Sequence, residues 1–411
     1  MLSRQALEDI LIIDFTTVWA GPFTTRLLAD FGATVIKVES IQHPDPMRFA
    51  HQPLGQPSEK PYNRGGYFHQ FHYNKYGITL DISRSKGREI LMQLVKKCDV
   101  FVSNYSPRAL KNLGLTYEEL SKVNPSVIVS LISGYGNTGP YRDMPALGSC
   151  IEAITGFRGI IGYGDGIPIT PGTTTADPVA SLHSAFAILA AIVERRKTGK
   201  GRSIDVSICE SFACILEESI LEFTVMQKEP HQLAAGHSYY APYGFYRSKG
   251  DDSWIAISVT SDKEWAALVR IIGNSALTAE KYSDSISRWQ NRQELDRVIE
   301  AWTSDKDAHE AMQLLQQAGV SAGACNNSSD VLNEVHLKAR DFFWSVTSPD
   351  TGTYPLAGPV IKLSETPATL RLSPPALGEH NEYVLSDLLG FSVEEIDTLK
   401  RERIIGNEPA Y

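Results

Sequence analysis

The sequence predicts an α/β protein with a parallel sheet, and two observations carry that prediction. Through the first half of the 411 residues, short apolar runs alternate with segments of helical periodicity, which is the pattern of βαβ units. Strands that alternate with helices form a parallel sheet with helices on its faces. A loop rich in His, Tyr and Pro at 229–243 then breaks the alternation, so we expect a second, smaller domain after it.

The predicted N-terminal elements follow in order along the chain. A strand at 10–15, a helix at 22–30 and a strand at 34–38 form the first βαβ unit. The alternation continues with a strand at 78–82, a helix at 85–97, a strand at 100–103, two short helices between 107 and 123, and a strand at 127–132. A long helix at 177–196, a turn at 198–201, a strand at 203–207 and a helix ending near 227 complete this half.

The second half predicts a different organisation. A strand at 254–259 precedes three amphipathic helices, near 262–272, 292–302 and 308–318. From about Asn326 the chain mixes short helices with turns rich in Pro and Gly, and a predicted helix pair follows His380. We interpret these segments as a small domain and a separate tail.

Composition indicates an ordinary soluble globular protein and argues against several classes. The chain is 42% hydrophobic and 21% charged, with 39 basic and 48 acidic residues and a net charge of −9. Such a balance argues against a general nucleic-acid or anionic-membrane partner. Five cysteines without a Cys-x-x-Cys pair argue against a disulfide framework and a zinc knuckle. Acidic Glu8 and Asp9 precede only a short apolar run, so we expect neither a signal peptide nor a membrane span but a cytoplasmic protein.

Several motifs fail on their structural context. The first βαβ unit has TTVWAGP at 16–22 where a dinucleotide site needs Gly-x-Gly-x-x-Gly, so a nicotinamide enzyme is not expected. The Gly-x-Ser-x-Gly string at 319–323 follows a helix and leads into a strand, the reverse of a hydrolase nucleophile elbow. His69 and His72 lack a third ligand, so we expect no metal site.

Asp177 is the residue at which we place the chemistry. Asp is a favoured N-cap and Pro178 suits the first helical position, so the pair predicts a helix start at Asp177. A carboxylate there meets the positive end of the helix dipole, which favours its ionised form by roughly 0.3 to 1 kcal/mol. Taken alone, this pattern indicates only a structural cap.

The surviving motifs together resemble the class III CoA-transferase family, which includes formyl-CoA and carnitine CoA-transferases. The resemblance spans nearly the whole chain. It rests on DFTTVWAGP at 14–22 with LADFGATVIKVE at 28–39, NKYGITLD at 74–81 with DVFVSNYSP at 99–107 and GLTYEEL at 114–120, GYGNTGP at 134–140, Asp177 with KTGKG at 197–201, and GEHNE at 378–382.

This resemblance implies a fold and an assembly that periodicity does not show. It implies a large Rossmann-like domain with a parallel sheet, built from both chain ends, and a smaller α/β middle domain. On this basis we expect the N-terminal part of the large domain at 1–225, the small domain at 226–325, and a linker with the C-terminal return at 326–411. It also implies an interlocked homodimer.

The resemblance further implies the site residues. Asp177 matches the catalytic aspartate of a CoA-transferase, with coenzyme A bound as an acyl-CoA and a carboxylic acid as the second substrate. The backbone N–H groups of Val18, Trp19 and Ala20 are the candidate oxyanion donors. Lys75 is the best candidate for a phosphate of CoA, since an ammonium suits that contact. The other implied CoA-binding residues are Arg48, His72, Tyr73, Asn74, Asn104, Tyr105 and Ser106, with Arg108 and Lys111 as further basic candidates.

The implied reaction begins with attack of the Asp177 carboxylate on the donor thioester, succinyl-CoA being one candidate donor, to give an aspartyl mixed anhydride. Gly148 replaces an acidic residue of many relatives, and the glycine-rich loop of formyl-CoA transferases is absent around 239–246. We therefore expect an acid larger than formate or oxalate, such as a dicarboxylate or aryl acid. Two alternatives stay open: a 2-methylacyl-CoA racemase-like isomerase, although its His-Asp pair is absent from LGSCI at 147–151, and a CoA-binding partner subunit of a heteromeric transferase, against which the retained Asp177 argues.

Overall fold

A computed structural model describes residues 5–50, 54–56, 58–229 and 236–410. The chain forms two compact units. The large unit comprises Met1–Thr155, Pro171–Ile220 and Ala339–Tyr411, and the small unit comprises Gly156–Thr170 and Leu221–Lys338. Both chain ends thus enter the large unit, and the small unit takes in residues 156–170 in addition to the middle of the chain.

A six-stranded sheet forms the centre of the large unit, in the order β3-β2-β1-β4-β5-β6. All five strand pairs are parallel, which confirms the predicted α/β class, and the order is that of a doubly wound Rossmann-like fold. The strands are β1 (Leu11–Phe15), β2 (Thr34–Glu39), β3 (Lys75–Thr79), β4 (Val100–Ser103), β5 (Ile128–Ser133) and β6 (Arg202–Ser207). β3 begins earlier than the predicted 78–82, because its pairing with β2 starts at Lys75 opposite Val35.

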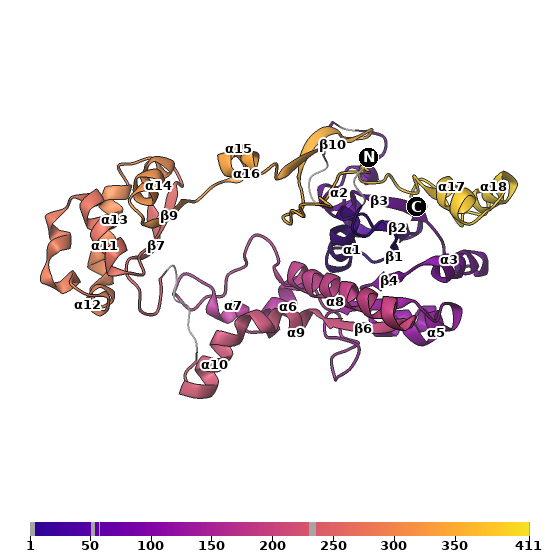
Figure 1. Ribbon diagram of the computed structural model, residues 1–411, viewed down its shortest axis with the longest axis horizontal. Helices are drawn as coiled ribbons and strands as arrows, with labels where there is room; N and C mark the ends of the chain where they lie inside the picture. Colours follow the sequence, from indigo (N-terminus) through magenta and orange to yellow (C-terminus); the bar gives the residue numbers. More distant parts are fainter. Residues whose placement is uncertain (1–4, 51–53, 57, 230–235, 411) are drawn as a thin grey trace. The chain divides into compact units, whose positions relative to one another are not determined.

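Helices cover both faces of this sheet (Figure 1). One face packs on α1 (Ala20–Asp30) and α8 (Ala176–Thr198) through residues such as Ile12, Val102 and Ile188. The other packs on α3 (Ser85–Lys97), α4 (Pro107–Leu113) and α5 (Tyr117–Val123). The other helices of this part of the chain are α2 (Gly66–His72), α6 (Gly148–Ile154), α9 (Ile208–Ala213) and α10 (Glu217–Met226), with short 3-10 turns at Pro46–Arg48, Pro61–Asn63 and Cys214–Leu216.

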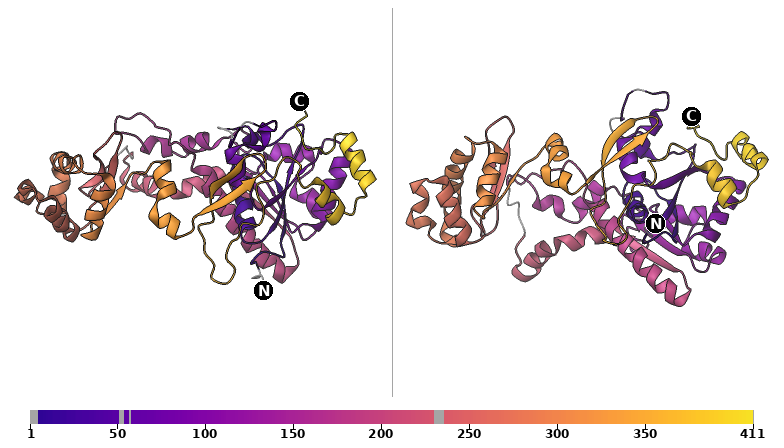
Figure 2. Two further views of the ribbon diagram at one scale, coloured as in Figure 1. Left: turned by 90° about the horizontal axis from the view of Figure 1, so that it is seen from above. Right: turned by 45° about the horizontal axis from the view of Figure 1, so that its top comes forward.

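The C-terminal segment returns to the large unit (Figure 2). It forms an antiparallel hairpin, β10 (Phe343–Ser348) and β11 (Gly352–Ala357), then α17 (Asn381–Tyr383), a π-helical turn at Val384–Leu388, and α18 (Val393–Arg401). Asn381 Oδ1 accepts from the Thr79 N–H at 2.8 Å, and the His380 N–H donates to the Gly77 carbonyl at 2.9 Å. The return segment therefore satisfies backbone groups of the edge strand β3, which would otherwise stay unpaired.

The small unit has its own sheet and core. Three antiparallel strands, β7 (Tyr243–Arg247), β8 (Trp254–Ser258) and β9 (Ser321–Ala324), pair in that order. Their buried side chains pack with those of α11 (Asp262–Ile272), α13 (Arg292–Thr303) and α14 (Ala308–Gln317). The predicted smaller α/β domain is confirmed by this arrangement. Its remaining helices are α7 (Phe157–Ile160), α12 (Ser285–Gln290), α15 (Ser328–Asn333) and α16 (Val335–Ala339), the last ending at the unit boundary, with 3-10 turns at Ser275–Thr278 and Glu280–Tyr282.

One helix of the large unit, α8, is long and apolar enough to cross a membrane, with a mean hydropathy of 1.6 in its most apolar window. Its length and composition have another explanation here, because one side of α8 packs on the sheet and on α1. The opposite side carries the exposed apolar residues Leu182, Phe186, Leu189 and Val193, which lie on one helical face by their spacing.

Candidate active site

The loop that follows β1 is hydrogen-bonded to the loop that follows β4, and both loops contain residues predicted to contact CoA. The Thr17 N–H donates to Asn104 Oδ1 at 2.8 Å, and the Asn104 amide donates to the Thr17 carbonyl at 2.7 Å. The rings of Phe15 and Tyr105 lie 5.2 Å apart between centroids. Because β1 and β4 are parallel neighbours, their carboxyl ends bring these loops to the same edge of the sheet. The structure thus places the loop of Val18 next to that of Asn104 and Tyr105.

Asp177 lies within the first turn of α8. The helix begins at Ala176 with Thr175 at the N-cap position, so the prediction that Asp177 is the cap residue is wrong by two positions. Thr174 Oγ1 donates to Asp177 Oδ2 at 3.3 Å. Ser181 Oγ contacts the Asp177 carbonyl at 2.8 Å and the Ala20 carbonyl at 2.7 Å. The nucleophile candidate and the start of α1 are therefore linked through one hydroxyl.

The surroundings of Asp177 act against its ionised form. Burial raises the pKa of the Asp177 carboxyl, and the Glu152 carboxylate raises it further, while hydrogen bonds from Thr174 and from the Ala20 N–H oppose that rise. The net direction is upward, opposite to the effect expected from the helix dipole alone. Glu152 is itself fully buried and accepts from the Thr175 N–H at 2.6 Å and from its hydroxyl at 3.0 Å. Glu152 thus anchors the turn that precedes Asp177.

Gly148, the first residue of α6, lies against the nucleophile candidate. A Cβ atom built on Gly148 would overlap Asp177 Oδ2 and would lie 3.0 Å from Thr174 Cβ. The absence of a side chain at Gly148 is therefore what lets the Asp177 carboxylate occupy its position. The sequence showed Gly148 as a departure from relatives but not its contact with Asp177.

The predicted basic contacts to CoA are enclosed in ion pairs. Lys75 Nζ lies 2.8 Å from Asp14 Oδ2, and both side chains are fully buried. Arg48 pairs with Glu39 at 2.7 Å with no more than 2% of either side chain exposed. Burial lowers the pKa of Lys75 to about 8 in spite of Asp14. An ammonium without solvent access cannot meet a phosphate, so the interpretation of Lys75 as a phosphate partner does not fit the structure. The guanidinium of Arg48, predicted to lie at the CoA site, is likewise enclosed by Glu39.

The neighbouring predicted residues also have structural contacts. Tyr73 is buried and its hydroxyl donates to the Ala357 carbonyl at 3.1 Å. Asn74 adopts a left-handed φ of 63°, and its Oδ1 accepts from the Arg371 N–H at 2.6 Å. Ser106 caps α4 through a hydrogen bond from Ala109. These contacts tie Tyr73 and Asn74 to the return segment.

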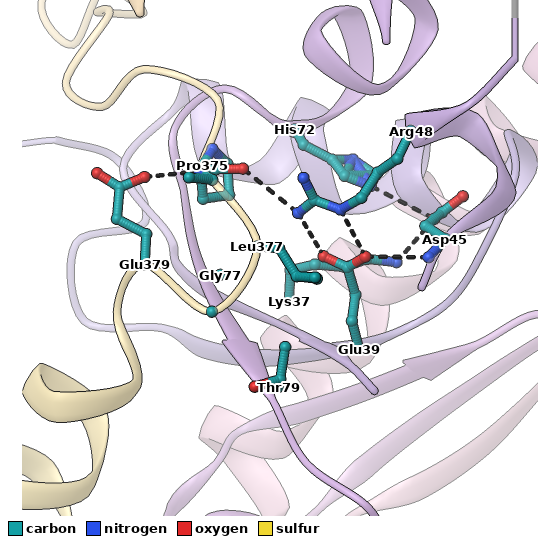
Figure 3. Close-up of polar contacts among 12 residues, drawn as sticks. Lys37, Glu39, Asp45, Arg48, His72, Gly77, Thr79, Pro375, Leu377 and Glu379 are labelled. Carbon is teal, nitrogen blue, oxygen red and sulfur yellow. Dashed lines mark hydrogen bonds and ion pairs between the residues drawn. The ribbon is translucent and has the colours of Figure 1, made fainter. Parts of the chain in front are cut away.

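A buried acid that sequence reasoning missed lies beside the loop. Asp45 Oδ2 accepts from Lys37 Nζ at 3.0 Å and lies 3.6 Å from His72 Nε2 (Figure 3). Its Oδ1 accepts from the Val18 N–H at 3.3 Å. Burial disfavours the Lys37 ammonium, but the carboxylates around it, Asp45 foremost, outweigh burial and raise its pKa. One signal was available: Asp14 and Lys37 each stand between apolar residues within a strand, and buried charges need partners.

The Trp19 side chain packs under the loop. Its ring lies 5.7 Å from that of Tyr67 and 5.3 Å from that of Phe71.

Within the described residues, the Trp19 N–H has no hydrogen-bond acceptor, whereas the N–H groups of Thr17 and Val18 are engaged. Of the three predicted oxyanion donors, Trp19 is therefore the one with a free backbone donor, while the Ala20 N–H points to Asp177.

The loop at 229–243 that breaks the alternation of strands and helices lies partly outside the described residues, at 230–235. Its described remainder groups the rings of His237, Tyr240 and Tyr243. These line a pocket of the small unit of about 310 Å³ that also includes Arg292 and Asp296.

Comparison with known proteins places these features in a family. The profile of CoA-transferase family III matches residues 7–381. The succinyl-CoA–D-citramalate CoA-transferase of Chloroflexus aurantiacus is 32% identical over 402 residues, which is 98% of this chain and 98% of that protein. The formyl-CoA:oxalate CoA-transferase of Afipia carboxidovorans is 30% identical, with 98% of this chain and 99% of that protein covered.

The fold agrees with this relationship. The crystal structure of a CAIB/BAIF family protein from Brucella suis superimposes with a TM-score of 0.85 at 28% identity, and the match covers 93% of this chain and 99% of that one. The sequence resemblance to class III CoA-transferases is thereby confirmed, and the family profile spans residues 7–381. The chain belongs to CoA-transferase family III, and it is an enzyme that transfers coenzyme A.

Proposed function

We propose that this enzyme transfers CoA from succinyl-CoA to a dicarboxylic acid, with Asp177 as the nucleophile. The position of Asp177 supports its assignment as the nucleophile. Its carboxylate lies in the first turn of α8, next to the Ala20 N–H and the loop after β1. Similar proteins supply the substrate class, since several are named for succinyl-CoA as donor and for citramalate, malate or glutarate as acceptor.

The chemistry proceeds by alternating attack of carboxylates and thiolate. An Asp177 oxygen attacks the thioester carbonyl, the C–S bond breaks and CoA leaves as a thiolate, so a mixed anhydride forms. The thiolate then attacks the Asp177 carbonyl and releases the donor acid, which leaves an aspartyl thioester. The acceptor carboxylate attacks this thioester, and the thiolate is expelled again. Attack of the thiolate on the acceptor carbonyl of the second anhydride gives the new acyl-CoA and restores the Asp177 carboxylate.

The Trp19 N–H is the proposed oxyanion donor in these steps. Each attack on a carbonyl places negative charge on its oxygen, and fixed backbone donors stabilise that charge without reorganisation. The Trp19 N–H fits this role because it lies next to Ala20, whose own N–H faces Asp177. Holding thioester and carboxylate together contributes on the order of 7 to 11 kcal/mol to such reactions, far more than the dipole of α8.

We propose that CoA contacts the loop after β4 and the start of α4 rather than the buried cations Lys75 and Arg48. Tyr105 is 37% exposed, and Arg108 and Lys111 on α4 are exposed as well. Arg108 and Lys111 are therefore accessible to a phosphate group, whereas the buried Lys75 and Arg48 are not. We infer that the family positions of Lys75 and Arg48 serve the loop that CoA approaches, while Arg108 and Lys111 attract the anion.

Trapping the intermediate tests the proposed nucleophile. With succinyl-CoA and hydroxylamine, the protein should acquire a hydroxamate at Asp177, which peptide mass spectrometry locates, and Asp177→Ala should abolish both the hydroxamate and transfer to the acceptor. Asp397→Ala, a change of an exposed carboxylate on α18, is the matched control and should leave both unchanged. Full transfer by Asp177→Ala would refute the proposal.

We also propose that the chain works as an interlocked homodimer. The support is the exposed apolar face of α8, in which Phe186 is 75% exposed and Leu182 56% exposed. A soluble protein rarely leaves such a contiguous apolar face open to water. A second copy of the chain is the proposed cover. Similar proteins do assemble from chains of this kind, since two from Chloroflexus aurantiacus are named as the alpha and beta subunits of a succinyl-CoA–L-malate CoA-transferase.

A further inference from the structure

The backbone between β1 and α1 is held at Thr16, Thr17 and Val18 by polar side chains from other segments of the chain. Lys37 Nζ donates to the Thr16 carbonyl, Asn104 binds both the N–H and the carbonyl of Thr17, and Asp45 accepts from the Val18 N–H. A connecting loop of this kind usually lies at the surface with its backbone groups hydrated. Here the side chains of Lys37, Asn104 and Asp45 fix the loop shortly before Ala20, whose N–H faces Asp177.

The backbone conformation of Val18 explains why the loop needs these hydrogen bonds. The φ of Val18 is 67°, in the left-handed region that a β-branched residue rarely adopts. Conformations of this kind persist only where the surrounding structure imposes them, and they gather at functional sites. Asp45 provides the only side-chain acceptor of the Val18 N–H among the described residues, at 3.3 Å from Oδ1.

Asp45 is itself built into a rigid setting (Figure 3). It is 3% exposed, its Oδ1 also accepts from the Met47 N–H at 3.0 Å, and its Oδ2 accepts from Lys37. The Asp45 N–H in turn donates to Glu39 Oε1 at 3.0 Å, and Glu39 pairs with Arg48. The buried charges therefore form a chain that starts at β2 and ends at the Val18 peptide.

The residues after Val18 connect this chain to the reaction centre. Trp19 occupies the N-cap position of α1, and the next N–H, that of Ala20, points to the Asp177 carboxylate. The Ala20 carbonyl accepts from Ser181, which also binds the Asp177 carbonyl. A change of φ at Val18 would rotate the Trp19 and Ala20 peptides, and with them the Ala20 N–H that faces Asp177 and the free N–H of Trp19 beside it.

We propose that Asp45 is a positioning residue for CoA transfer: it holds Val18 in its left-handed conformation and thereby aims the Trp19 and Ala20 N–H groups at the reaction centre. The inference rests on the proposed function of Asp177. In this proposal Asp45 is not a catalytic residue, because it acts through the backbone of Val18.

A double-mutant cycle between Asp45 and Val18 tests this coupling. Asp45→Asn weakens the hold on the loop and should lower kcat by about tenfold, the effect of losing one charge-assisted hydrogen bond, with a smaller change in KM. Glycine adopts a φ of 67° without strain, so in the Val18→Gly background the same Asp45→Asn change should cost less than about threefold. Asp284→Asn, which alters an exposed capping aspartate of α12, is the control and should leave kcat unchanged.

Hydroxamate formation counts the active sites in each variant, so kcat is expressed per competent enzyme and a loss of folded protein does not alter it. Equal losses of kcat in both backgrounds would overturn the role of Asp45. If Asp45→Asn does not fold, the double variant decides: folding of Asp45→Asn with Val18→Gly supports the role, and its failure to fold shows that Asp45 serves Lys37 alone. Absence of hydroxamate in the unmodified enzyme would instead refute the proposed function.

Discussion

At the scale of the residue, the Asp177 carboxyl has a pKa raised chiefly by burial and then by Glu152. A nucleophile must be ionised, so anhydride formation should fall as the pH drops through this raised pKa. Replacing Glu152 by its neutral isostere, Glu152→Gln, keeps an oxygen acceptor for the Thr175 N–H and removes the repulsion. The pKa of Asp177 should then fall, and the acid limb of the pH profile should move to lower pH.

Rates of hydroxamate formation measured across acidic pH check this shift. Glu394→Gln, on the exposed side of α18, is the control and should leave the profile in place. An acid limb that stays fixed in Glu152→Gln, or that moves to higher pH, would contradict the assigned repulsion.

The surroundings of Lys75 and the role of Asp45 could not be predicted from the sequence. Asp177 could be found from its position in a family motif, but the same motif reasoning assigned Lys75 to a phosphate. A sequence does not distinguish an exposed lysine from one enclosed by Asp14 and Thr25, because the partners lie 61 and 50 residues away. Asp45 carried no motif, since its importance comes from its contact with Val18.

At the scale of the element, the starts of α6 and α8 fit together through Gly148. Gly148→Ala would push a Cβ into Asp177 Oδ2, and the nucleophile or its turn would have to move. Displacements of about 1 Å cost roughly 10²-fold in rate, so we expect kcat to fall by about that factor while the fold is retained. Gly159→Ala is the control, because a Cβ there meets nothing within 4 Å.

Steady-state transfer rates and thermal melting of the two variants provide the measurement. Gly148→Ala with normal kcat would show that Asp177 has freedom to move, and the tight approach would then have no catalytic role. If Gly148→Ala alone lowered the melting temperature strongly, the close approach of Gly148 to Asp177 would be required for the stability of the fold rather than for catalysis.

Elements themselves were largely predictable, for a physical reason. α3 at Ser85–Lys97 and α11 at Asp262–Ile272 coincide with their predicted ranges, because each has an amphipathic pattern. For α11, Gly273 adds a clear stop. The start of β3 was missed since Lys75 is polar, and a buried ion pair hides strand character from a hydrophobic pattern.

At the scale of the whole molecule, local pattern predicts the parallel sheet but not the return of the chain. The side-chain oxygen of Asn74 binds the backbone at Arg371 and Leu372, and Arg48 binds the Pro375 carbonyl at 3.3 Å (Figure 3). Such contacts span about 300 residues, so only the family resemblance pointed to a domain built from both chain ends. Arg48 thereby links the charge chain behind Val18 to the C-terminal segment.

The proposed assembly leads to a prediction about exchange of subunits. In an interlocked dimer, separation requires unfolding of at least one connecting segment, so tagged and untagged dimers that are purified separately and then mixed should form no hybrids, while co-expression should yield them. Light scattering should give twice the 45.4 kDa of one chain. Phe186→Glu places a charge on the exposed apolar face of α8 and should prevent dimer formation, whereas Lys197→Glu, in the last turn of the same helix, should not. Rapid formation of hybrids by the purified dimers would exclude interlocking, and a monomer with full transferase activity would leave the apolar face of α8 for another partner.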